Sequence, residues 1–137
     1  MIEVSDELSM RALGGQLATQ WKAGEVVRLI GPLGAGKTTL VRGVLEGLGY
    51  DGPVRSPTFN LIQIYETQPP VLHADLYRLK SAAGLGLEDY ESSHLLLVEW
   101  PDRMDDLFPP ESAWTVAIEI VGEGRRVTID PPSRYSP

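Results

Sequence analysis

One short glycine-rich run constrains the fold of this chain more than any other feature. Residues 31–38 read GPLGAGKT and fit the pattern G-x-x-x-x-G-K-S/T. An apolar stretch over 25–30 precedes the run, and an amphipathic pattern over 37–48 follows it. A strand, a tight loop and a helix in this order form a phosphate-binding loop, because the loop amides and the helix N-terminus attract an anion. The run therefore predicts an α/β fold of the P-loop type.

The fixed positions of the run each have a chemical role. Glycines let the backbone turn tightly, so that successive amides point at phosphate oxygens. We expect Lys37 to reach the β- and γ-phosphates of ATP, and the Thr38 hydroxyl to bind Mg²⁺, which prefers oxygen ligands. The expected cofactor-binding residues of the loop are Leu33, Gly34, Ala35, Gly36, Lys37, Thr38 and Thr39.

Two carboxylates follow apolar stretches and are candidates for holding the metal and orienting the attacking water. Glu99 follows the apolar run 95–98, and Asp75 follows 71–74. A carboxylate on a neighbouring strand commonly completes a P-loop magnesium site. We therefore expect Lys37, Asp75 and Glu99 to be catalytic, and Thr38 and Glu99 to bind the metal. The alternative for either acid is a strand-end cap or a surface charge.

The remaining pattern predicts one P-loop domain over 1–137, a sandwich with a central mixed, largely parallel sheet. Apolar periodicity predicts a helix from Ser5 or Asp6 to Trp21. It also predicts strands at 58–65, 71–74 and 94–100, and a C-terminal antiparallel pair at 114–121 and 127–129. The proline-rich end, 130–137, is expected to be loose.

Composition narrows the classes of function. The chain has no cysteine, which excludes a disulfide scaffold, a zinc–thiolate site and a thiol nucleophile. Its net charge of −7 is unfavourable for a stand-alone nucleic-acid binder. We see no signal-peptide pattern and no long apolar window, so a cytoplasmic protein that does not span a membrane is expected. The acidic stretch 88–106 is either a solvated face or a docking surface for a basic protein.

Several polar residues beside these runs keep open roles. The sequence Ser56-Pro57-Thr58 is either a nucleotide-sensing loop or a plain turn. The two histidines are too few for a metal site; His73 either orients Asp75 or is an ordinary strand histidine. Tyr77 and Arg78 either sense phosphate or make structural contacts.

The absence of other sequence motifs separates the P-loop classes. The chain has no N-K-x-D and no D-x-x-G segment, which a GTPase needs, and no arginine-rich lid, which a kinase uses to stabilise the transferring phosphate. A minimal ATPase remains. The alternatives are an ATP-gated binding module, in which turnover is incidental, and a small-molecule kinase.

A known family shares these motifs in the same order. The segments are GAGKTT at 34–39, SPTF at 56–59, HADLYRL at 73–79, GLEDY at 86–90 and LVEWP at 97–101. Together they resemble the TsaE (formerly YjeE) family over roughly residues 5–130. This family contains the bacterial ATPase of tRNA threonylcarbamoyladenosine biosynthesis.

The resemblance implies an activity and partners. It implies a Mg²⁺-dependent ATPase that alone converts ATP slowly to ADP and phosphate. It also implies the partner proteins TsaB and TsaD, through which tRNA is reached, and hydrolysis that resets their complex.

The resemblance also assigns residues by position. Lys37 and Thr38 match the family's phosphate and metal residues, Glu99 its metal-associated Glu, and Asp75 the acid of its H-x-D-L-Y-R segment. Thr39, Ser56, Thr58 and Trp100 also fall in motif positions of the family. Pro32 stands where the family usually has Asp, and residues 81–84 have fewer acids than is usual. Purine contacts are expected from Glu7 and from Arg125 or Arg126.

Overall fold

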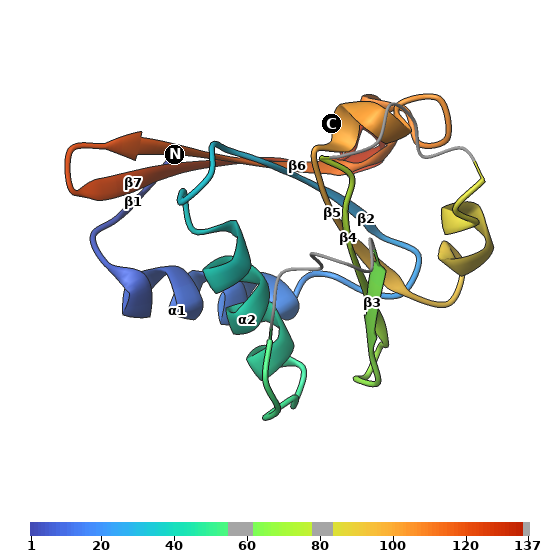
Figure 1. Cartoon of the computed structure of the whole chain (residues 1–137), viewed down its shortest axis with the longest axis horizontal. Coiled ribbons are helices and arrows are strands. Elements are labelled where there is room, and N and C mark those ends of the chain that lie inside the picture. Colours follow the sequence, from blue (N-terminus) through green and yellow to red (C-terminus); the bar gives the residue numbers. More distant parts are fainter. Residues whose placement is uncertain (55–61, 78–83, 136–137) are drawn as a thin grey trace.

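The computed structural model describes residues 1–54, 62–77 and 84–135, and in this part of the chain the strands form one seven-stranded sheet (Figure 1). Across the sheet the strands follow the order β1-β7-β6-β2-β5-β4-β3. Their bounds are β1 Ile2–Val4, β2 Val26–Ile30, β3 Ile62–Tyr65, β4 Val71–Asp75, β5 Leu95–Glu99, β6 Trp114–Val121 and β7 Gly124–Asp130.

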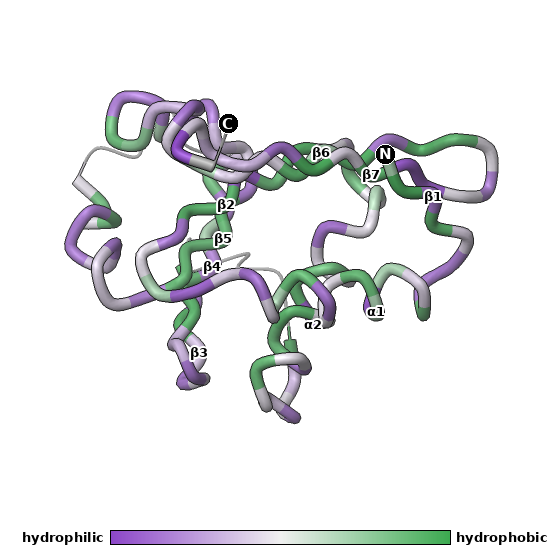
Figure 2. Tube along the Cα trace, turned by 180° about the vertical axis from the view of Figure 1, so that it is seen from behind, coloured by the Kyte–Doolittle hydropathy of each residue, from purple (hydrophilic) through white to green (hydrophobic). Residues whose placement is uncertain are grey.

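The centre of the sheet is parallel and its margins are antiparallel. β2 pairs in parallel with β5 and with β6, and β4 pairs in parallel with β5. The pairs β3–β4, β6–β7 and β1–β7 are antiparallel. The predicted mixed sheet with a C-terminal strand pair is therefore confirmed. The hydrophobic colouring along β5 in Figure 2 matches a strand whose five residues are all buried, as expected when both faces of a sheet are covered.

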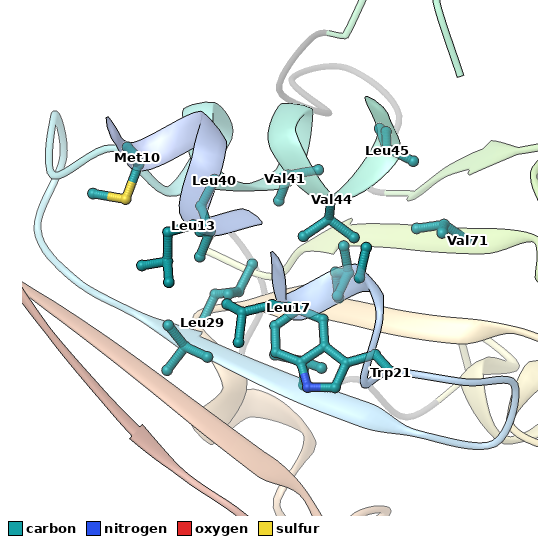
Figure 3. Close-up of a cluster of buried hydrophobic side chains, with 14 of the residues drawn as sticks. Met10, Leu13, Leu17, Trp21, Leu29, Leu40, Val41, Val44, Leu45 and Val71 are labelled. Carbon is teal, nitrogen blue, oxygen red and sulfur yellow. The ribbon is translucent and has the colours of Figure 1, made fainter. Parts of the chain in front are cut away.

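Two helices pack together against one face of the sheet (Figures 1 and 3). Helix α1, Glu7–Ala18, begins after Asp6, whose carboxylate accepts a hydrogen bond of 2.8 Å from the Ser9 amide. That bond lowers the pKa of Asp6 below its ordinary value. Helix α2, Lys37–Gly47, begins directly at the glycine-rich loop. No helix in the described residues is long and apolar enough to cross a bilayer.

The contact between α1 and α2 leaves no room for side chains at two glycines. A Cβ atom at Gly43 would lie 2.1 Å from the carbonyl oxygen of Arg11, and one at Gly14 would lie 2.4 Å from that of Leu40. The structure shows close packing inside an unbroken helix.

We expect Gly43→Ala to lower the free energy of unfolding by about 1–3 kcal/mol, because the two helices must separate to admit the methyl group. Chemical denaturation measures this change. Gly15→Ala is the matched control, since its Cβ would lie at an ordinary 3.8 Å from the carbonyl oxygen of Gly43. Helix propensity favours that change by about 1 kcal/mol. Equal stability of the two variants would contradict this account of the helix contact.

Loops and short 3-10 segments cover the other face of the sheet. Leu72, Leu96 and Val98 point to that face and pack in one buried cluster with Met104 and Phe108. In the region 130–137, the described residues contact the body of the protein. Ser133–Tyr135 forms a 3-10 turn, and Arg134 donates to the carbonyl of Ser112 and pairs with Glu25.

Candidate nucleotide-binding site

The phosphate-binding loop lies between the end of β2 and the start of α2. Gly34 and Gly36 both adopt positive φ angles, 80° and 109°, which favour glycine. Gly36 is the N-cap of α2, and in the described part of the chain no side chain caps that helix end. The first amides of a helix have no partners within the helix and carry its partial positive charge. The start of α2 can therefore accept an anion.

Lys37, the first residue of α2, has a nearly buried side chain with partners inside the site. Its Nζ donates a 2.6 Å hydrogen bond to the carbonyl of Gly31, at the start of the loop. The same Nζ lies 3.8 Å from Oε1 of Glu99 and 5.0 Å from the ring centroid of Trp100. A nucleotide phosphate that binds Lys37 would thus contact an ammonium group that the site already holds in place.

Glu99 ends β5 and is only 4% exposed. Its Oε2 lies 2.7 Å from Nε2 of the fully buried His73. An ionised carboxylate only accepts hydrogen bonds, so Nε2 carries the proton when Glu99 is charged. From the sequence, His73 either orients Asp75 or is an ordinary strand histidine with its hydrogen bonds satisfied; the structure pairs it with Glu99 instead of Asp75. The register explains the difference, because β4 and β5 place Asp75 directly opposite Glu99, and His73 lies one pleat earlier on the same face.

The first pocket beside the loop gathers most of the predicted phosphate and metal residues. It has a volume of about 300 Å³. It is lined by Leu33, Gly34, Gly36, Lys37, Thr38, Thr39, Asp75, Tyr77, Glu99 and Trp100. The carboxylate of Asp75 also accepts a 3.0 Å bond from the amide of Tyr77, so Asp75 acts as a strand-end cap as well as lining the pocket.

The oxygen donors of the first pocket fit a magnesium ion. Thr38, with a hydroxyl, and Asp75 and Glu99, with carboxylates, are among its lining residues. Among residues 1–54, 62–77 and 84–135, no three His, Cys, Asp or Glu side chains form a metal-binding group by themselves. At nucleotide sites Mg²⁺ takes one or two carboxylates and completes its shell with phosphates and water.

A second pocket of about 300 Å³ lies beside the same loop. Its lining residues are Ser5, Asp6, Glu7, Met10, Gly34, Ala35, Gly36, Thr39, Glu123 and Arg125. Gly34, Gly36 and Thr39 line both pockets, so the two adjoin across the loop. The structure thus brings Glu7 and Arg125 together. Arg126 instead pairs with Glu3 and Glu119.

Sequence reasoning missed a third, larger pocket of about 530 Å³. Apolar groups such as Pro101 and Ile118 line it, and it shares Lys37 and Trp100 with the first pocket. Trp100 follows β5 in a left-handed backbone conformation, with φ at 57°, and its ring packs against Tyr77 at 4.8 Å between centroids.

Ser56, Thr58 and Arg78 lie outside the described residues, so the expected nucleotide-sensing loop is not placed.

The fold and the loop define a P-loop α/β protein of the nucleotide-binding type. A sequence model of the family described as "Threonylcarbamoyl adenosine biosynthesis protein TsaE" matches residues 4–127. The chain therefore belongs to the TsaE family, and the resemblance drawn from the motifs is confirmed. The described activity of this family is in threonylcarbamoyladenosine biosynthesis.

Individual relatives agree with this assignment. The chain is 35% identical to the tRNA threonylcarbamoyladenosine biosynthesis protein TsaE of Haemophilus influenzae, over 92% of this chain and 85% of that protein. It is 44% identical to the Streptomyces coelicolor protein of the same name, over 66% of each chain. The crystal structure of Bacillus subtilis YdiB superposes with a TM-score of 0.80 at 30% identity, covering 98% of this chain and 86% of YdiB.

Proposed function

We propose that this chain is a Mg²⁺-dependent ATPase that cycles a complex of TsaB and TsaD in the cytoplasm and reaches tRNA through that complex. One observation carries the ATPase part of the proposal. The open N-terminus of α2, the Lys37 ammonium and the carboxylates of Asp75 and Glu99 line one pocket. A cation, the amides of a helix N-terminus and carboxylates together suit a metal-bound triphosphate and a water molecule.

The two adjoining pockets suggest how ATP lies across the loop. Its triphosphate would occupy the first pocket, where Leu33, Gly34, Gly36, Thr38 and Thr39 line the wall beside Lys37. Its adenosine would occupy the second pocket, beside Ala35, Glu7 and Arg125. In this arrangement the predicted loop residues would contact the phosphates or the metal, and Glu7 and Arg125 would lie beside the adenosine.

Three side chains of this protein would act in hydrolysis. Lys37 would stabilise the negative charge that develops on the β–γ bridge as the bond to the γ-phosphorus breaks. Glu99, held by His73, would orient the attacking water and receive its proton, and Asp75 would hold the metal or the same water. Thr38 and Glu99 would bind Mg²⁺, which supplies charge neutralisation on the phosphate oxygens.

The experiment that tests this proposal measures phosphate release from ATP by the chain alone and with TsaB, TsaD and tRNA. We expect slow release alone, faster release with the partners, and loss of release when EDTA removes the metal. Equal turnover by a complex that lacks this chain would contradict the proposal. A phosphorylated acceptor in place of free phosphate would favour the kinase. Repeated formation of modified tRNA by a variant that binds ATP without hydrolysing it would favour the ATP-gated binding module.

A further inference from the structure

Arg125, on β7, contacts the backbone of the phosphate-binding loop. Its Nε donates to the carbonyl of Ala35 at 3.0 Å, and its Nη2 donates to the carbonyl of Gly34 at 3.1 Å. Its Nη1 donates to the carbonyl of Gly124, in its own strand, at 2.9 Å. All three nitrogens of the guanidinium group are therefore engaged by main-chain oxygens.

These bonds determine how part of the loop is oriented. A peptide group is planar and trans, so the carbonyl of one residue and the amide of the next point in opposite directions. The bond to Ala35 therefore directs the amide of Gly36 away from Arg125. The peptide group that joins Gly34 to Ala35 is held at both ends. Its carbonyl accepts from Arg125, and its amide, that of Ala35, donates a 3.1 Å hydrogen bond to the carbonyl of Pro32. One side chain thus holds two consecutive peptide groups of the loop, those whose carbonyls belong to Gly34 and Ala35.

The strand that carries Arg125 is itself held on both sides. In the antiparallel sheet Arg125 lies opposite Val4 of β1 and Ile120 of β6. The guanidinium group is a rigid planar fork with donors in fixed directions, so it can hold two neighbouring carbonyls at once. An ammonium group at the same place is a point charge without that geometry.

We propose that Arg125 is a positioning residue that holds the loop in its phosphate-binding shape, rather than a residue that recognises the purine. This inference rests on the proposed function only for the identity of the ligand, a polyphosphate chain. The loop shape itself is a property of the protein without ligand. Arg126, the next residue, offers a matched control because it pairs with Glu3 and Glu119 and lines neither loop pocket.

The test compares Arg125→Lys and Arg125→Ala with Arg126→Lys and Arg126→Ala, all in the full chain. Calorimetric titration gives the Kd for ATP and for inorganic tripolyphosphate, which has no purine. We expect both Arg125 variants to bind both ligands roughly 10- to 100-fold more weakly, the range for losing hydrogen bonds from a charged donor. The Arg126 variants should bind like the original protein. Thermal melting shows which variants are folded. If Arg125→Ala is unfolded, the test relies on Arg125→Lys, which keeps the charge and the aliphatic part of the side chain.

Amide hydrogen exchange in the absence of ligand provides an independent readout. We expect faster exchange over residues 31–38 in both Arg125 variants and unchanged exchange in the Arg126 variants. Unchanged exchange in Arg125→Lys would overturn the inference, and so would wild-type affinity in that variant. A loss confined to ATP, with tripolyphosphate bound normally, would assign Arg125 to the purine instead. If the unaltered chain binds neither ligand, the proposed function fails, while the exchange measurement still decides the role of Arg125.

Discussion

Replacing Lys37 with alanine is expected to abolish measurable ATP binding, with a loss of affinity of at least about 100-fold, or roughly 3 kcal/mol. The reason is the position of the ammonium group. It is only 6% exposed and lies between the loop carbonyl of Gly31 and the carboxylate of Glu99. Calorimetric titration with ATP and Mg²⁺ measures the loss.

Lys22→Ala is the control for the change in net charge, because Lys22 is an exposed lysine between α1 and β2. It removes the same charge from the chain and should leave the Kd for ATP unchanged. A melting curve for each variant establishes that the protein is folded. An unaltered Kd in folded Lys37→Ala would remove the basis of the proposed ATP site.

The second large effect is expected from Glu99→Gln, which keeps the shape of the side chain and removes its charge. Phosphate release should fall by about 10²- to 10⁴-fold, the usual contribution of a positioned acid–base group. The Kd for ATP should change much less, since the loop amides and Lys37 remain. Single-turnover phosphate release and calorimetric titration on the same preparation separate the two quantities.

Asp106→Asn is the matched control for Glu99→Gln, since Asp106 is an exposed acid of the 88–106 stretch that lines none of the three pockets. It should hydrolyse ATP at the original rate. Full hydrolytic activity in Glu99→Gln would leave Glu99 with a structural role only, as the partner of His73.

The parts of the fold that could be predicted are those with a local signal. The strand, loop and helix over 26–47 follow from an apolar run, glycines and helical periodicity. Two features were missed because their signals are weak. β1 has only three residues and exists by pairing with β7 at the far end of the chain. β7 begins at Gly124, three residues before the predicted start, because a glycine and two arginines there hide the strand pattern.

The candidate site was predictable to a similar extent. Lys37 and Thr38 belong to a local motif, and Glu99 and Asp75 lie at the carboxyl ends of parallel strands, where ligands of α/β proteins usually bind. The bond from His73 to Glu99 depends on the register of β4 against β5, which a single sequence does not specify. The bonds from Arg125 to the loop join residues 90 and 91 positions apart. No local pattern encodes such a contact.

The hydrogen bond between Lys37 and the carbonyl of Gly31 has a consequence for turnover. The bond already satisfies the lysine when the protein is empty, so an arriving nucleotide exchanges one acceptor for another. The contribution of Lys37 to the affinity is then the difference between its bond to the phosphate and its bond to the carbonyl of Gly31. This difference is smaller than the phosphate contact alone would give. In the proposed ATPase cycle, the same exchange would operate in reverse after hydrolysis. As ADP left, Lys37 would again donate to the carbonyl of Gly31, which would favour product release and repeated cycles.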